Sequence, residues 1–98
     1  KYFADMVEYM DHDFARLMKK LEESGQADNT LILFFADNGT PKEITSKKGS
    51  LVIPGGKGLT TDAGMHVPMI ARFGPRTPVG RVCADLVDST DFLPTMMD

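Results

Sequence analysis

The sequence has no tryptophan, a single cysteine and no long apolar run. The lone Cys83 excludes a disulfide within the chain and gives no information about the redox compartment. A membrane-spanning helix needs about 18 consecutive apolar residues, and the longest run, residues 31–36, is much shorter. No membrane span is therefore expected.

An excess of basic residues is also missing. The net charge is −3, and no basic stripe stands out along the sequence. Nucleic acids and anionic membranes are therefore not the expected partners. The chain has 98 residues, of which 42% are apolar and 26% charged. This composition is typical of one small globular domain.

The most informative segment is the apolar run 30–36, which ends abruptly in Asp37, Asn38 and Gly39. A continuous run of large and β-branched residues predicts a strand that is covered on both faces. Open sheets place their ligands beyond the carboxyl ends of such strands. We therefore expect Asp37 and Asn38 at a site, at the end of a strand with parallel neighbours, and a sharp turn at Gly39.

An amphipathic helix is predicted before this strand. Apolar residues recur at steps of three and four between Phe3 and Leu21, and the pattern ends near Ser24 and Gly25. A helix, a short turn over residues 26–29 and a buried strand form half of a βαβ unit. The sequence thus predicts an α/β fold with a parallel or mixed sheet flanked by helices.

The remaining elements are predicted from weaker patterns. Residues 38–58 show no periodicity, which indicates a long irregular loop that is functional or disordered. Residues 67–73 are predicted as a second strand and residues 81–87 as a third, shorter one. Asp88 or Ser89 is the expected cap of a closing helix.

Two segments carry candidate chemistry. Asp37 and Asn38 offer hard oxygen ligands for Ca²⁺ or Mg²⁺, although the dipeptide alone favours a simple turn in which these side chains bond to nearby backbone. Lys57 lies among Gly55, Gly56 and Gly58, a spacing that does not match the phosphate-binding loop. Lys57 is either a cation held close to an anionic substrate or part of a flexible surface loop, and the segment alone favours the loop.

The order of these motifs resembles the sulfatase family, within the alkaline-phosphatase-like superfamily. The usual signature of that family is Gly-Lys-Gly, two or three residues, Glu-Gly-Gly, one residue, Arg, one residue and Pro, and residues 56–68 follow its spacing. The resemblance extends over nearly the whole chain. It implies that residues 1–98 form a single partial domain, a C-terminal part of the catalytic domain and a fragment of an α/β/α sandwich. The lack of a capping residue before the first helix also indicates a piece of a larger protein.

Three positions depart from the signature. Asp62 stands where Glu is commoner, Ala63 where Gly is, and His66 where Arg is usual. Asp62 and His66 are expected to support the site without touching the reacting group. A purely structural role is the favoured alternative for His66.

The resemblance also implies a mechanism. In this family a Cys or Ser within a Cys/Ser-x-Pro-x-Arg motif becomes formylglycine, which attacks sulfur beside a divalent cation, usually Ca²⁺. Asp37 and Asn38 match the later pair of cation ligands, and Lys57 matches the lysine that contacts the sulfate. Cys83 is not followed by Pro and Arg, so we expect it to be a buried structural thiol instead of the nucleophile.

The implied function, hydrolysis of sulfate esters, therefore belongs to the parent enzyme, and residues 1–98 alone are expected to be inactive. A related hydrolase of phosphonate or phosphate esters and a non-catalytic binding or assembly module are the alternatives. The expected substrate is a small sulfate ester or a sulfated glycan, and the family implies a periplasmic, secreted or lysosomal location. Unpaired strand edges make self-association of the isolated chain an expectation as well.

Overall fold

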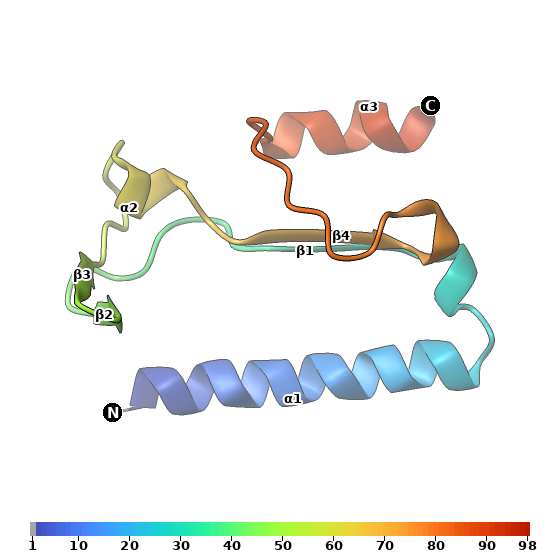
Figure 1. Ribbon diagram of the computed structural model, residues 1–98, viewed down its shortest axis with the longest axis horizontal. Coiled ribbons are helices and arrows are strands. Elements are labelled where there is room, and N and C mark those ends of the chain that lie inside the picture. The colour runs from blue at the N-terminus through green and yellow to red at the C-terminus, as the bar shows by residue number, and fades with distance from the viewer. Residues whose placement is uncertain (1) are drawn as a thin grey trace.

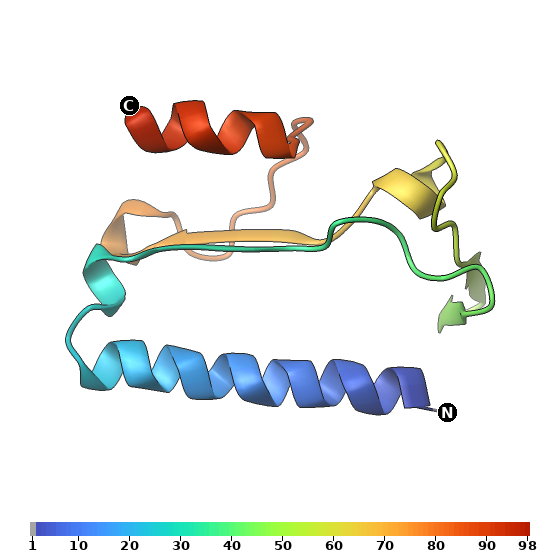
Figure 2. The same cartoon turned by 180° about the vertical axis from the view of Figure 1, so that it is seen from behind.

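The computed structural model describes residues 2–98, which form three layers (Figure 1). The long helix α1 (Tyr2–Glu23) lies on one side of a two-stranded sheet, β1 (Leu31–Phe35) and β4 (Met69–Phe73). The short helix α3 (Phe92–Met97) lies on the other side, and the view from behind shows the same stack (Figure 2). The predicted α/β class with flanking helices is confirmed.

Helix α1 ends as the sequence predicted. Gly25 adopts a positive φ of 70°, a conformation that glycine reaches without steric cost. The N–H of Gln26 donates to the carbonyl of Leu21 and that of Gly25 to the carbonyl of Glu22, each at 3.0 Å. This pair of bonds is a Schellman motif, which satisfies the last carbonyls of the helix and reverses the chain toward β1.

A helix faces each side of strand β1, but the predicted cover is only partial, because none of its residues is buried and Leu31 and Phe35 are exposed. Successive side chains of a strand point to opposite faces. The ring of Phe34 lies edge-on to Phe14 of α1, with centroids 5.6 Å apart, and the ring of Phe35 lies edge-on to Phe92 of α3 at 4.9 Å. These two aromatic contacts join the three layers.

The predicted parallel pairing is wrong for the strands that the structure describes. Strand β4 pairs with β1 in antiparallel register, from Leu31 opposite Phe73 to Phe35 opposite Met69. Two parallel strands need a crossover that returns the chain to the starting end of the sheet. Here the chain leaves β1 and re-enters at β4 from the same end, and everything between them lies beyond that end (Figure 1).

The segment beyond that end is not the irregular loop that the sequence predicted. It contains a hairpin of β2 (Thr45–Lys48) and β3 (Leu51–Pro54), followed by the one-turn helix α2 (Asp62–Met65). The hairpin turns at Gly49 and Ser50, where Gly49 has a φ of 62°. Two-residue hairpin turns favour such a residue because the positive φ matches the twist of the strands.

The third predicted strand is also wrong. Residues 81–87 are irregular, and the side chains of Val82 and Leu86 are almost fully exposed. The apolar residues of this segment favoured a strand, but no neighbouring strand in the described part of the chain offers backbone partners. A strand without partners leaves its N–H and C=O groups to water.

Asp88, one of the two predicted caps, caps the 3₁₀ turn that precedes the closing helix. Asp88 accepts a hydrogen bond from the N–H of Thr90, and the Asp91 carboxylate accepts one from the N–H of Asp88 at 2.9 Å. This reciprocal capping box orders the short 3₁₀ turn (Ser89–Asp91) that leads into α3. None of the helices among residues 2–98 is long and apolar enough to cross a membrane.

Candidate functional site

Asp37 and Asn38 follow directly on the carboxyl end of β1. The Asp37 side chain is exposed and Asn38 is half-buried. The ladder with β4 continues one step beyond the strand, because the N–H of Ala36 donates to the carbonyl of Pro68 at 3.3 Å. The predicted position of this pair at a strand end is therefore confirmed.

Three glycines hold the site segments together. We call Gly39, Gly56 and Gly64 the glycine junction. The N–H of Gly39 donates to the carbonyl of Gly64 at 2.9 Å. A Cβ on Gly39 would lie 2.8 Å from the Cα of Gly64, and a Cβ on Gly64 would lie 2.5 Å from the carbonyl oxygen of Gly56. Such contacts leave no room for a side chain, so the backbones of three separate segments touch.

The junction brings Lys57 next to the segment that carries Asp37 and Asn38. The N–H of Lys57 donates to the carbonyl of Thr40 at 2.9 Å, while its side chain is exposed. Gly58, which follows, has a φ of 81° and turns the chain toward α2. The loop around Lys57 is thus fixed through its backbone, which leaves the ammonium group available to a ligand.

Asp62 is the first residue of α2, and His66 directly follows the helix. The Nδ1 atom of His66 is 3.5 Å from the Oδ2 atom of Asp62, and their side chains are 79% and 95% exposed. The N–H groups of Gly39 and Ala36 donate to the carbonyls of Gly64 and Pro68. These bonds continue the antiparallel register of β1 and β4 toward α2. By this register residue 66 of the backbone lies opposite residue 38, while the His66 side chain is exposed.

The donor set fits part of a cation site. Asp37 and Asn38 supply a carboxylate and an amide oxygen, both suited to Ca²⁺ or Mg²⁺. Within residues 2–98, no group of three or more His, Cys, Asp or Glu side chains is arranged to hold a metal ion. Because Ca²⁺ takes six to eight oxygen ligands, a complete site would need oxygen donors in addition to Asp37 and Asn38.

Cys83 differs from its prediction. The thiol is exposed instead of buried, and it lies 3.1 Å from the Oδ2 atom of Asp85. The reason is the missing third strand, because the irregular segment 81–87 has no sheet to pack into. Its surroundings show no link to the site at the end of β1.

The hairpin beside the site is the feature that sequence reasoning missed. The signal was present as Gly49 and Ser50 between two runs that can form strands, a dipeptide that favours a tight hairpin turn. The close packing at Gly39 and Gly64 had no comparable local signal, because it joins segments that are distant in sequence.

Comparison with known proteins identifies the family. The family described as Sulfatase matches residues 1–98, which is the whole chain. The chain therefore belongs to the sulfatase family, as the resemblance indicated.

Individual relatives agree with this assignment. The chain is 33% identical to the steryl-sulfatase of Mus musculus over 100 residues and 34% identical to the arylsulfatase A of Homo sapiens over 95 residues. It is 31% identical to the ulvan-active sulfatase of Formosa agariphila over 88 residues. These alignments cover 96%, 96% and 90% of this chain but only 16%, 18% and 13% of the relatives. The chain thus spans about a sixth of the length of these relatives, and no solved structure matches it significantly.

Proposed function

We propose that the sulfatase containing this chain hydrolyses sulfate esters at the end of β1, with Asp37, Asn38 and Lys57 in its active site. The observation that carries the proposal is the glycine junction, which ties the Asp37 segment and the Lys57 loop into one backbone unit.

Each of the three residues has a distinct role in this proposal. Asp37 and Asn38 hold one side of a Ca²⁺ or Mg²⁺ ion through oxygen atoms. When bound, the cation supplies a Lewis acid that polarises the sulfate. The Lys57 ammonium binds a sulfate oxygen and offsets the negative charge that develops in the transition state. Its position between glycines suits close approach to an anion.

The supporting pair acts next to these groups. The Asp62 carboxylate lies 3.5 Å from Nδ1 of His66, and the backbone register sets residue 66 opposite residue 38. We propose that the imidazole orients the Asn38 amide, so that its oxygen faces the cation. For this role Nδ1–H of a neutral imidazole faces Asp62, and Nε2 accepts a hydrogen bond from the side-chain NH2 group of Asn38, so no permanent charge is needed.

The nucleophile has no counterpart within residues 1–98. No Cys/Ser-x-Pro-x-Arg motif occurs there, so a formylglycine nucleophile and the remaining cation ligands are supplied by another part of the polypeptide. It follows that the 98-residue chain alone does not turn over sulfate esters and binds Ca²⁺ only weakly.

The test uses the full-length sulfatase with an aryl sulfate and the matching aryl phosphate as substrates. We expect the sulfate to be preferred. Asp37→Asn should raise the Ca²⁺ concentration needed for half-maximal activity by at least about tenfold, because metal affinity depends strongly on ligand charge. Asp11→Asn, which removes an exposed carboxylate from α1, is the matched control and should change nothing.

Other outcomes point to the alternatives. Preference for the phosphate ester would favour a phosphate or phosphonate ester hydrolase of the same superfamily. If neither ester is hydrolysed at any cation concentration, the fold serves binding or assembly. An Asp37→Asn variant with unchanged cation dependence would remove Asp37 from the cation site.

A further inference from the structure

Asn38 is followed by Gly39, and an asparagine in front of a glycine is chemically labile. The backbone nitrogen of the following residue can attack the side-chain amide carbon, and glycine does not obstruct the attack because it has no Cβ. The other asparagine of residues 1–98 is Asn29, which precedes the β-branched Thr30. The stiff side chain of Thr30 crowds its own nitrogen. Asn38 is therefore the labile asparagine of this chain.

The reaction that threatens Asn38 is deamidation through a cyclic succinimide. The Gly39 nitrogen gives its proton to hydroxide and attacks Cγ of Asn38, so that a new N–Cγ bond forms. The Cγ–Nδ2 bond breaks, and the nitrogen takes a proton from water and leaves as ammonia. Water then opens the ring at either carbonyl, which gives aspartate or isoaspartate at position 38. Water and hydroxide are the only co-reactants.

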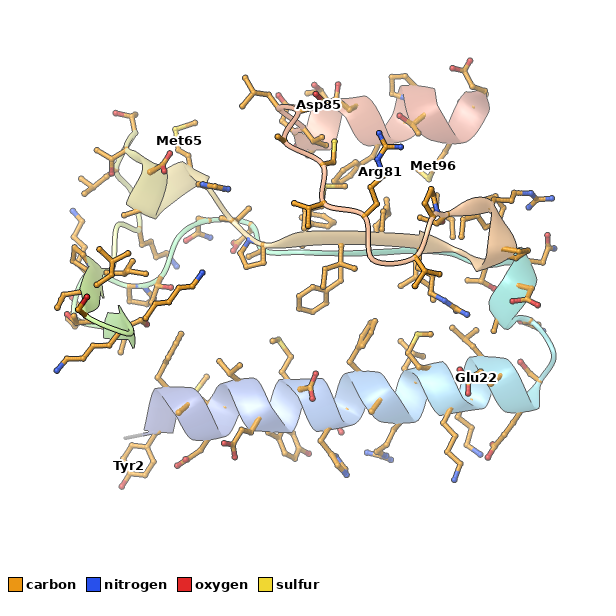
Figure 3. All side chains as sticks on the ribbon, in the orientation of Figure 1. Tyr2, Glu22, Met65, Arg81, Asp85 and Met96 are labelled. Atoms are coloured by element: carbon orange, nitrogen blue, oxygen red, sulfur yellow. The ribbon has the colours of Figure 1, made fainter. Side chains whose placement is uncertain are left out.

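The structure holds the attacking nitrogen of Gly39 in place. Its N–H donates to the carbonyl of Gly64 at 2.9 Å, and an amide proton in such a bond is released only when the bond opens locally. A Cβ on Gly39 would lie 2.8 Å from the Cα of Gly64, so backbone touches backbone. The side chain of the next residue, Met65, points away from the segment that follows β1 (Figure 3). While this contact is closed, the Gly39 nitrogen cannot swing toward the Asn38 side chain.

The chain on both sides of the dipeptide is tied as well. Before it, the N–H of Ala36 donates to the carbonyl of Pro68 at 3.3 Å. After it, the carbonyl of Thr40 accepts from the N–H of Lys57 at 2.9 Å. Closing the succinimide ring requires the backbone between these ties to rotate, so the flanking bonds oppose the reaction too.

We propose that Asn38 is a latent deamidation site and that the glycine junction keeps its amide intact in the folded protein. No residue with a Cβ fits at position 39, so the glycine that makes the amide labile is also the one that the junction requires. The inference does not depend on the proposed function. Its consequence for the cation site does, because deamidation would replace a neutral ligand by a carboxylate.

The experiment follows deamidation of the full-length sulfatase in mildly alkaline buffer, both folded and in concentrated urea. Samples are digested at intervals, and mass spectrometry measures the mass gain that amide hydrolysis gives in the peptide carrying Asn38. It also separates the aspartate and isoaspartate products. The peptide that carries Asn29 is the internal reference.

Two glycine variants separate the junction from general stability. Gly64→Ala overpacks the junction, because the new Cβ would lie 2.5 Å from the Gly56 carbonyl oxygen. Gly74→Ala is the matched control. Its Cβ would lie 2.7 Å from the Cα of Asp28, which overpacks the opposite end of the β1–β4 sheet and leaves the junction untouched.

We expect Asn38 to deamidate at least about tenfold more slowly in the folded wild type than in urea, because the reaction needs local opening. Gly64→Ala should speed the reaction of the folded protein by about two- to tenfold, which corresponds to the loss of one backbone hydrogen bond. Gly74→Ala should match the wild type, and Asn29 should react slowly in every sample. If Gly64→Ala does not fold, hydrogen exchange of the wild type decides. The Gly39 amide should then exchange at least about tenfold more slowly than in the unfolded chain.

Several results would overturn the proposal. One is equal deamidation of Asn38 in the folded wild type and in urea, and another is a Gly39 amide that exchanges at the unfolded rate. Equal acceleration in Gly64→Ala and Gly74→Ala would assign the protection to overall stability instead of the junction. Aspartate without isoaspartate would show direct hydrolysis, in which the Gly39 nitrogen takes no part. If the wild type hydrolyses no ester, the proposed function fails, but the deamidation rates still decide this inference.

Discussion

The N–H of Gly39 donates a hydrogen bond of 2.9 Å to the carbonyl of Gly64, across 25 residues of sequence. This bond closes the glycine junction and lets the site segments touch backbone to backbone. The candidate site therefore depends on small residues that carry no chemistry themselves.

Gly64→Ala should disturb this arrangement. The new Cβ would lie 2.5 Å from the Gly56 carbonyl oxygen, so the Lys57 loop has to move. We expect a loss of about 1–3 kcal/mol in the free energy of unfolding of the full-length sulfatase, the range typical of overpacking, together with reduced activity. Denaturant unfolding and kinetics measure both.

The control for that variant is Gly49→Asn. Gly49 lies at the hairpin turn with open space around it, and Asn tolerates its positive φ better than other side chains do. A change of only a few tenths of a kcal/mol is expected. If Gly64→Ala were as mild as this control, the junction would not be as rigid as its contacts indicate.

Lys57→Ala tests whether Lys57 contributes to catalysis or to the stability of the fold. The Lys57 side chain is exposed and its fixed contact is made by its backbone N–H, which alanine retains. We therefore expect nearly unchanged thermal unfolding, but a loss of roughly 10²–10³ in kcat, as for removal of one group that stabilises developing negative charge. Lys42→Ala, which removes another exposed lysine from the same segment, should retain most of the activity on a small ester. Equal losses of stability and activity in Lys57→Ala would indicate a structural lysine.

The aromatic contact between β1 and α3 predicts which side chain holds α3 against the sheet. Phe92 packs on Phe35 with centroids 4.9 Å apart, and its truncation to Ala removes the main aromatic link between α3 and the sheet. We expect Phe92→Ala to destabilise the protein by about 1–3 kcal/mol, less than a fully buried Phe because the site is half-exposed. The neighbouring Leu93 is 66% exposed, and Leu93→Ala should have a much smaller effect. Similar losses in both variants would show that Phe92 is not the anchor.

Local patterns in the sequence predicted α1, β1, β4 and the Asp88 cap, because each depends on periodicity or on one capping residue. The position of Asp37 and Asn38 followed from the apolar run before them. The strand direction could not be predicted in this way, since it depends on the path of the chain between Asn38 and Pro68. The exposure of Cys83 was missed for the same reason, because it depends on whether residues 81–87 find a partner strand.

The Asp88 cap gives a pH dependence of known sign. Hydrogen bonds from the side chain and then the backbone of Thr90 lower the pKa of the Asp88 carboxyl below its ordinary value. A carboxyl with a lowered pKa in the folded state stabilises that state above its ordinary pKa, and the contribution is lost as the pH falls through the lowered value. We expect the amides of α3 to lose hydrogen-exchange protection over that acidic range.

Asp88→Asn is the matched variant for this effect. Asparagine is also a good N-cap, so α3 should stay formed. The loss of hydrogen-exchange protection at acidic pH that the Asp88 carboxyl causes should disappear in this variant. A wild-type profile in Asp88→Asn would show that the pH dependence does not come from the Asp88 carboxyl.

The isolated 98-residue chain is predicted to self-associate. Its accessible surface is 8573 Å², whereas a compact protein of 10.8 kDa exposes roughly 5,500 Å². Its radius of gyration is 15.8 Å, against about 12.6 Å for a compact chain of this length. The excess of about 3,000 Å² on one chain is more than one partner's share of a typical obligate interface, which buries about 2,000–5,000 Å² over both partners. A two-stranded sheet also leaves strand edges that can pair with another copy. Sedimentation of the purified chain should therefore show dimers or larger species at micromolar concentration. In the full-length sulfatase the same surface should be protected from hydrogen exchange. A cooperatively melting monomer at high concentration would contradict this prediction, since it would show that the chain is stable with this surface exposed.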